Sequence, residues 1–144
     1  MKVAVIGGGA AGFFAAIAVK ENFPNAEVVI LEKTQKLLAK VSVSGGGRCN
    51  LTNGVSSIGA FSKAYPRGSK QLKKAFQVFN NSHVIQWFET RGVSLYTQDD
   101  NRVFPTSNDS QTIIDCFLKE VKRLQIEIRK GEKIEAIKPL DEQL

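Results

Sequence analysis

The sequence predicts an α/β fold in which parallel strands alternate with helices, and three features of its first 32 residues carry that prediction. An apolar, β-branched run at 2–6 leads directly into a turn of glycines. A helix-like stretch follows at 13–20 and stops at a proline-containing turn at 22–25. A second run, at 26–31, is apolar enough to be buried on both faces of a parallel sheet. Strand, glycine turn, helix and strand in this order indicate a βαβ unit.

The glycine turn has the spacing that a bound pyrophosphate requires. Gly7 allows a tight turn, Gly9 lets the backbone approach a phosphate, and Gly12 lets the helix pack against its strand. The N-terminus of the helix that follows also offers free N–H groups and a partial positive charge. The first 20 residues therefore predict a Rossmann-like seat for a dinucleotide.

An acidic residue closes the second apolar run. Glu32 lies 20 residues beyond Gly12, where the dinucleotide fingerprint expects a carboxylate for a ribose. A carboxylate accepts hydrogen bonds from the two ribose hydroxyls but repels a 2′-phosphate. FAD or NAD is therefore expected, rather than NADP.

Length and composition limit the class of protein. The 144 residues suit one domain, 1–144, and are short for a two-domain dinucleotide enzyme. No apolar run approaches the roughly 18–20 residues that span a bilayer, and Met1 leads straight into a strand without a signal peptide. Cys49 and Cys116 form neither a disulfide framework nor a metal motif. We expect a cytoplasmic protein without metal or membrane.

The net charge of +6 raises the question of a nucleic-acid partner. Basic residues interleave with aromatic ones in one segment: Lys63, Arg67, Lys70, Lys73 and Lys74 with Phe61, Tyr65, Phe76 and Phe79. Lys70, Lys73 and Lys74 have the i, i+3, i+4 spacing of one helix face, and Leu72, Phe76 and Phe79 would form the buried face. This spacing favours a solvated basic helix, so no nucleic-acid partner is expected.

The remaining chain alternates between helical and strand-like segments after a long loop at 34–59. Helices are expected at 69–79 and 82–90, each capped by a serine, and at 109–124, where Asp109 is the cap. Strands are expected at 93–97, 102–104, 125–129 and 133–138.

The long loop contains three successive glycines, Gly45 to Gly47, followed by a basic residue. Such a backbone can expose N–H groups as an anion nest, and Arg48 can pair with a phosphate or with the negative charge of a reduced flavin. On these residues alone, a phosphate cradle and a structural turn remain equally open.

The loop also carries a family resemblance. Ser-Gly-Gly-Gly-Arg-Cys-Asn-Leu-Thr-Asn at 44–53, after a Gly-x-Gly-x-x-Gly strand start, resembles the BaiN-like (aminoacetone-oxidase-like) family of FAD-dependent oxidoreductases. Arg-Val-Phe-Pro-Thr-Ser at 102–107 resembles a second motif of that family. The resemblance covers essentially the whole chain. It implies an FAD-binding domain of the glutathione-reductase type.

The resemblance also implies which residues contact the cofactor. Gly7, Gly9, Ala10, Ala11 and Gly12 would hold the FAD pyrophosphate. The adenosine ribose would lie at Glu32, with Lys33 beside it. The ribityl chain and flavin ring would follow Lys40 and the loop of Ser44, Gly45, Gly46, Gly47, Arg48, Cys49 and Asn50. Strand order places the backbone of Ile134 at the adenine edge.

Members of this family are much longer than 144 residues. They insert a substrate domain after a region like 133–139 and then return to complete the FAD domain. The resemblance therefore implies an incomplete, N-terminal portion that lacks the substrate domain and the returning segment. A sheet without its last strand has an exposed edge, so self-association is expected to be possible there.

Two functions follow from these expectations. The first is the FAD-binding portion of an oxidoreductase that transfers hydride between flavin and an unidentified small organic substrate, with NAD(P)H or oxygen as electron partner. The second is a non-catalytic module that binds FAD or NAD. No catalytic residue can be assigned, because the lone His83 lies beside an expected helix cap and no Ser/His/Asp or paired-carboxylate arrangement occurs.

Overall fold

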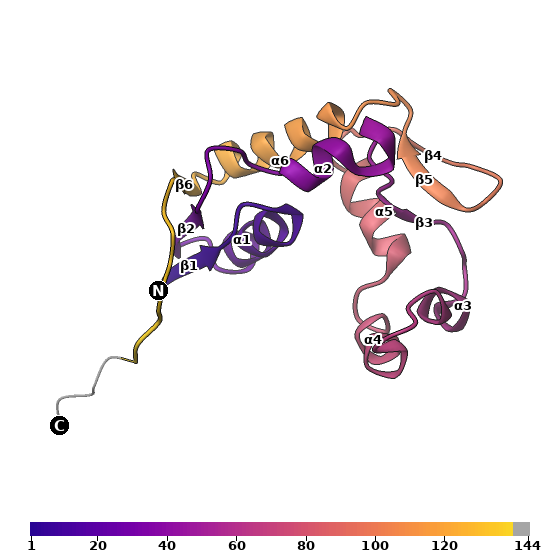
Figure 1. Ribbon diagram of the computed structural model, residues 1–144, viewed down its shortest axis with the longest axis horizontal. Coiled ribbons are helices and arrows are strands. Elements are labelled where there is room, and N and C mark those ends of the chain that lie inside the picture. Colours follow the sequence, from indigo (N-terminus) through magenta and orange to yellow (C-terminus); the bar gives the residue numbers. More distant parts are fainter. Residues whose placement is uncertain (140–144) are drawn as a thin grey trace. The chain divides into compact units, whose positions relative to one another are not determined.

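The computed structural model describes residues 1–139. They form two compact units (Figure 1). The first combines residues 1–39 with the described residues from 117 onward, and the second comprises residues 40–116.

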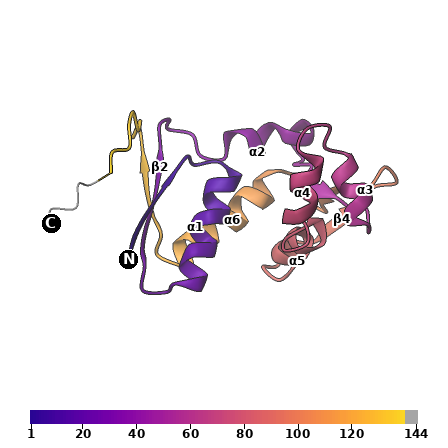
Figure 2. The ribbon, with the colours of Figure 1, turned by 90° about the horizontal axis from the view of Figure 1, so that it is seen from below.

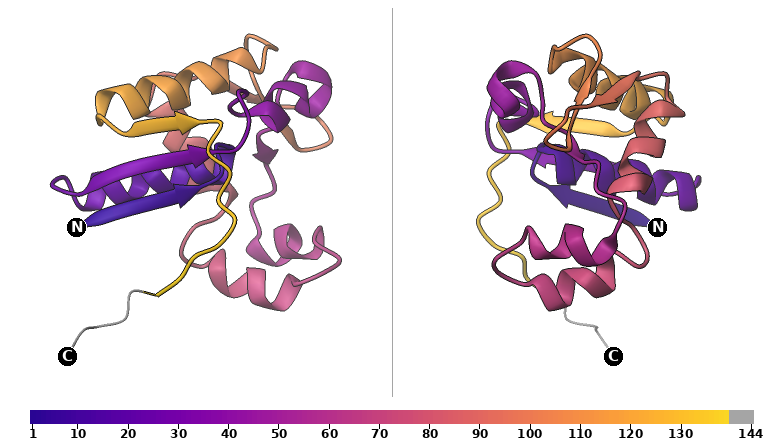
Figure 3. Two further views of the ribbon diagram at one scale, coloured as in Figure 1. Left: turned by 60° about the vertical axis from the view of Figure 1, so that its left-hand side comes forward. Right: turned by 90° about the vertical axis from the view of Figure 1, so that its right-hand side faces the viewer.

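The first unit is built on a three-stranded parallel sheet in the order β1-β2-β6. Its strands are β1 (Lys2–Ile6), β2 (Glu27–Glu32) and β6 (Glu127–Lys130). Val5 pairs with Ile30, and Ile30 pairs in turn with Ile128. Both pairings are parallel, and the three strands point the same way (Figure 3). Among residues 1–139, β1 pairs only with β2, and its other edge is open.

Helix α1 (Ala10–Asn22) connects β1 to β2 and supplies much of the apolar core of this unit. Phe13, Ala16 and Ile17 lie on its inner face and are fully buried. The Phe13 ring meets Phe117 of α6 (Gln111–Arg123) edge-on at a centroid distance of 5.9 Å. The ribbons of α1 and α6 are seen in Figure 2. Burying a phenylalanine of this kind stabilises a fold by about 1.5–3 kcal/mol.

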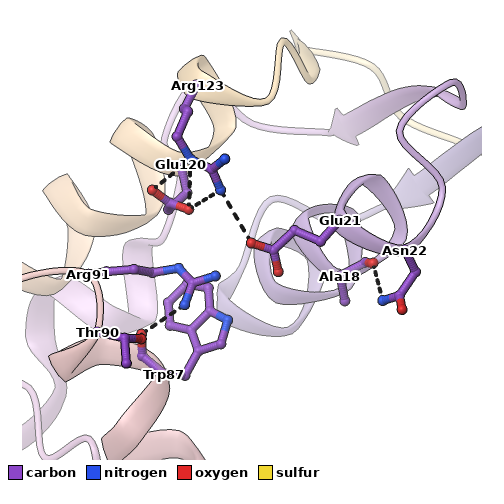
Figure 4. A network of polar contacts seen from close by, with 8 residues as sticks. All are labelled: Ala18, Glu21, Asn22, Trp87, Thr90, Arg91, Glu120 and Arg123. Atoms are coloured by element: carbon purple, nitrogen blue, oxygen red, sulfur yellow. Dashed lines mark hydrogen bonds and ion pairs between the residues drawn. The ribbon is translucent and has the colours of Figure 1, made fainter.

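Polar contacts join the same two helices at their C-terminal ends. The Arg123 guanidinium lies 2.6 Å from Oε2 of Glu120 and 3.2 Å from Oε1 of Glu21 on α1 (Figure 4). The Glu120 residue is only 5% exposed. A buried carboxylate needs such a partner, so Arg123 stabilises the packing of α6 on α1.

The second unit contains short helices and a small antiparallel sheet in the order β3-β5-β4. Its helical segments are α2 (Ala39–Val43), the 3-10 turn η1 (Ser44–Gly47), α3 (Ile58–Lys63), α4 (Ser69–Ala75), α5 (Asn81–Glu89) and the first part of α6. Its strands are β3 (Thr52–Asn53), β4 (Leu95–Thr97) and β5 (Arg102–Pro105). Phe88, Val103 and Phe104 are at most 2% exposed and lie in its core.

The α/β prediction is confirmed, and several local predictions are wrong. The strand expected at 133–138 does not form, since residues 132–139 have no regular secondary structure. Helix α5 is capped by Asn80 rather than by Ser82, and α4 follows Gly68 without a side-chain cap. Helix α4 ends at Ala75, which leaves Phe79 outside it and 39% exposed.

Several side chains of α5 and α6 have packing or capping roles. Phe88 and Cys116 are buried, and Trp87 lies under the guanidinium of Arg91, 3.8 Å from the ring centroid (Figure 4). The Nδ1 atom of His83 accepts a hydrogen bond from the Asn80 N–H, which completes the cap of α5. No helix among residues 1–139 is both long and apolar enough to cross a membrane.

Candidate functional site

Gly7, Gly9 and Gly12 of the glycine turn in the first unit differ in backbone conformation and in the space around them. Gly7 has φ +107° and donates its N–H to the Leu31 carbonyl, which turns the chain away from β1. A Cβ on Gly12 would collide with the carbonyl oxygen of Gly7, so only glycine allows α1 to start this close to the turn. A Cβ on Gly9 would meet nothing within 4 Å.

The open space at Gly9 lies at the start of α1. Gly9 is the N-cap residue of this helix and has no capping side chain. No hydrogen bond of the N–H groups of Gly9, Ala10 and Ala11 is recorded in the described part of the chain. Unpaired N–H groups at a helix start attract an anionic oxygen. The residues present therefore fit a phosphate-bearing group.

Glu32 is held beside this turn by hydrogen bonds. Its Oε2 accepts the N–H of Gly8 at 2.8 Å, and its Oε1 accepts both the N–H and the hydroxyl of Thr34 at 2.8 and 2.9 Å. These bonds, with that from Gly8 first, hold the pKa of the carboxyl below its usual range. The carboxylate is thus ionised and fixed next to the glycine turn.

The lowered pKa of Glu32 predicts a pH-dependent contribution to stability. The ionised form stabilises the fold above the ordinary glutamate pKa of about 4.3, and this contribution is lost as the pH falls through the lower pKa of the folded state. Thermal midpoints of the wild type and Glu32→Gln should therefore differ most near neutral pH and converge in acid.

Glu89→Gln provides a matched control for that experiment. Glu89 is an exposed glutamate of α5 whose side chain makes no hydrogen bond recorded within residues 1–139. The midpoint of this variant should follow the wild type at every pH. Curves for wild type and Glu32→Gln that stay parallel down to acid pH would contradict the assigned role of the carboxylate.

The chain between β2 and α2 is tied back to the glycine turn. Leu38 has φ +53°, is 1% exposed and donates its N–H to the carbonyl of Gly8. Sequence analysis missed both Leu38 and Thr34. Lys33 is exposed in this unit, and Lys40 is an exposed residue of the second unit.

The glycine loop of the second unit adopts a left-handed backbone. Gly45, Gly46 and Gly47 have φ +56°, +69° and +86°, and Cys49 has φ +60°. The side chain of Ser44 donates to Val41 O at 3.2 Å, and the N–H of Cys49 donates to Ser44 O at 3.0 Å. An anion nest pairs a right-handed residue with a left-handed one, and Arg48 (φ −92°, ψ −13°) followed by the left-handed Cys49 has this geometry.

Two residues that sequence analysis did not single out hold this loop. Ser110, 5% exposed, donates its N–H to Gly47 O at 2.8 Å and its hydroxyl to Ser42 O at 3.0 Å. The fully buried Phe104 lies 4.4 Å below the guanidinium of Arg48. Ser110 directly follows the expected cap Asp109, and Phe104 lies in the second family-like motif. The expected cap at Asp109 and the motif at 102–107 are therefore the sequence features that could have drawn attention to Ser110 and Phe104.

The other loop residues differ in accessibility. Asn50 and Gly46 are exposed, and Arg48 is half-buried, with its Nε donating to Gly45 O at 3.3 Å. Cys49 is 4% exposed, and burial raises the pKa of its thiol. A protonated, buried thiol is a poor nucleophile, which favours a packing role for Cys49.

One expected placement finds no support in the described residues, and a cavity of the first unit lies away from the candidate site. Ile134 was assigned to the adenine edge from strand order, but it lies in irregular chain and not in a strand. A cavity of about 550 Å³ in the first unit is lined by the amino ends of the strands, including Lys2, Glu27 and Glu127. Ligands of parallel sheets bind at the carboxyl ends, so this cavity is not the candidate site.

Comparison with known proteins places the chain in a family. The profile of the HI0933-like protein Rossmann domain matches residues 1–144. The chain belongs to this family. Its match confirms the Rossmann-type α/β fold and the resemblance recognised in the loop at 44–53.

Two characterised relatives share moderate identity with the chain. The 3-dehydro-bile acid delta(4,6)-reductase of Clostridium scindens is 29% identical over 138 residues, which cover 95% of this chain and 32% of the relative. The ribosomal RNA dihydrouridine synthase of Escherichia coli is 28% identical over 130 residues, which cover 87% of this chain and 30% of the relative. The chain thus spans about a third of the length of these relatives.

The fold also resembles a solved structure. The crystal structure of Thermovibrio ammonificans THI4 superposes with a TM-score of 0.57 at 11% identity, covering 90% of this chain and 38% of that one. At this identity the likeness shows the fold alone.

Proposed function

We propose that the chain is the FAD-binding part of a flavin-dependent oxidoreductase that saturates a carbon–carbon double bond conjugated to a carbonyl group. The main support for a dinucleotide site is the open space at Gly9, together with the Glu32 carboxylate that is hydrogen-bonded to the neighbouring Gly8. The pyrophosphate would lie on Gly9, Ala10 and Ala11, and the adenosine ribose at Glu32.

The names of the two relatives support the reaction class. One denotes a Δ(4,6)-reductase of a bile acid with a 3-oxo group, and the other denotes formation of dihydrouridine. In both chemistries the double bond is conjugated to a carbonyl, so one carbon gains a hydride and its neighbour gains a proton. A nicotinamide nucleotide is the proposed source of the electron pair. Bound FAD would supply the hydride-transfer chemistry.

The glycine loop at 44–50 is the proposed flavin-side element. Its left-handed backbone and Arg48 present N–H groups and a positive charge, which suit the electron-rich edge of a reduced flavin. Ser110 and Phe104 would act as positioning residues, because they contact the loop and not the cofactor. The two buried cysteines form no disulfide within residues 1–139, which fits a reducing cytoplasm.

A visible absorption spectrum of the purified protein tests the proposal. We expect flavin bands in the protein as isolated, or after incubation with FAD and removal of the excess. Titration with FAD, NAD and NADP should rank NADP last, because the Glu32 carboxylate disfavours a 2′-phosphate. The proposed flavin site requires FAD to bind more tightly than NAD. A colourless protein that binds NAD but cannot be reconstituted with FAD would instead support the non-catalytic dinucleotide module.

A further inference from the structure

Charge is distributed very unevenly along the chain. Nine of the 20 basic residues and none of the 14 acidic residues lie between positions 33 and 88. The rest of the chain therefore holds 11 basic and 14 acidic residues, and its charge is slightly negative. The net charge of +6 thus comes from one continuous segment.

Five of these nine basic residues lie on one helical hairpin of the second unit. We call α3, α4 and the turn between them, residues 58–75, the basic hairpin. Its basic residues are Lys63, Arg67, Lys70, Lys73 and Lys74, and all five are exposed. No ion pair or side-chain hydrogen bond of these five is recorded within residues 1–139. None of the five is therefore in a direct ion pair with the part of the chain that the structure describes.

The aromatic side chains of this region organise the hairpin. Phe61 is 6% exposed and lies 4.6 Å from the Phe76 ring, and Tyr65 lies 5.6 Å from both. This cluster packs α3 against α4. Lys70, Lys73 and Lys74 occupy one face of α4, where residues three and four apart are about 5–6 Å from each other.

We propose that the basic hairpin is a nucleic-acid contact surface that binds the phosphodiester backbone of RNA. Exposed, unpaired lysine and arginine side chains release counterions from phosphates, and this supplies most of the affinity in backbone binding. Tyr65 remains 38% exposed among these basic residues, and bases stack on exposed aromatic rings. In the cytoplasm proposed above, RNA is the abundant polyanion. The proposal does not depend on flavin binding.

The hairpin is poorly suited to the other common polyanion, a lipid surface. Amphipathic helices bind membranes by burying a continuous apolar face. Helix α4 has only seven residues, and Phe61 and Phe76 are already packed on each other. The charge therefore fits a phosphate backbone better than a bilayer.

The spacing of the lysines alone favoured a solvated helix without a nucleic-acid partner. The structure adds what the spacing did not show, namely that none of the five basic residues forms an ion pair recorded within residues 1–139. A merely solvated face usually carries charges of both signs.

Fluorescence anisotropy with a labelled RNA stem-loop at several salt concentrations tests the proposal. The test variant changes Lys70, Lys73 and Lys74 to Gln, and the control variant changes the exposed Lys119, Lys122 and Lys130 to Gln. Both lose three positive charges. The test variant should bind RNA about tenfold or more weakly, with a salt slope lower by about 2–3, while the control stays within about threefold of the wild type.

Three outcomes would overturn the proposal. Equal losses in the two variants would show that net charge, and not the hairpin, governs binding. Tighter binding to a duplex DNA of equal length would assign the surface to DNA. Binding to phosphatidylserine vesicles, but not to RNA, that the test variant loses would assign it to membranes. Circular dichroism of each variant establishes that it is folded, and the flavin spectrum reports the proposed function separately.

Discussion

Gly9→Val is expected to abolish binding of the dinucleotide while leaving the protein folded. Gly9 has φ −91° and ψ −178°, an extended conformation that valine adopts readily, and a Cβ there meets no protein atom within 4 Å. The added side chain therefore enters only the space proposed for the pyrophosphate. We expect the dissociation constant for FAD to rise more than about a hundredfold, which corresponds to about 3 kcal/mol.

Stability should change little in the same variant. Valine is a poorer N-cap residue than glycine, so a loss of about 1 kcal/mol in the free energy of unfolding is expected. Ala15→Val on the exposed side of α1 is the matched control, since it adds a larger side chain to the same helix outside its first turn. Unchanged FAD affinity in Gly9→Val would show that the pyrophosphate lies elsewhere.

The βαβ unit could be predicted from the sequence because each of its elements has a local cause. The apolar run at 2–6, the glycine spacing and the position of Glu32 are properties of neighbouring residues. The structure reproduces them as β1, α1 and β2, with Glu32 as the last residue of β2. Helix α6 was also predicted, because its apolar stripe has a helical period and Asp109 caps it.

The loop at 34–59 could not be predicted in the same way. It contains α2, the 3-10 turn and the start of α3, where the sequence indicated only a loop. The left-handed glycines are supported by Ser110 and Phe104, which lie more than 50 residues further along the chain. Contacts of this range leave no periodic pattern in the sequence.

The expected strand at 133–138 failed for a related reason. A strand requires a partner for its N–H and C=O groups, and alternation of apolar residues does not supply one. Within residues 1–139 the sheet neighbours are β1, β2 and β6 only, and Ile134 and Ile137 are 37% and 79% exposed. The placement of Ile134 at an adenine edge therefore has no strand to support it.

Gly12→Ala is expected to destabilise the protein strongly, although helix propensity predicts the opposite. Replacing glycine by alanine inside a helix usually stabilises it by up to about 1 kcal/mol. At Gly12, however, the new Cβ would collide with the carbonyl oxygen of Gly7, a backbone atom that a side-chain rotation cannot move away. We expect the free energy of unfolding to fall by about 3 kcal/mol or more, measured by urea denaturation.

Gly59→Ala separates the effect of helix propensity from the effect of the steric collision. Gly59 is also a glycine near the start of a helix, α3, and a Cβ there would meet only Oγ of Ser57, at an ordinary 3.5 Å. This control should be neutral or more stable by about 0.5–1 kcal/mol. If Gly12→Ala matched Gly59→Ala, α1 could start without close contact to the turn at Gly7. The turn would then not be the rigid seat that the proposed site requires, and loss of FAD binding in Gly9→Val would need a different explanation.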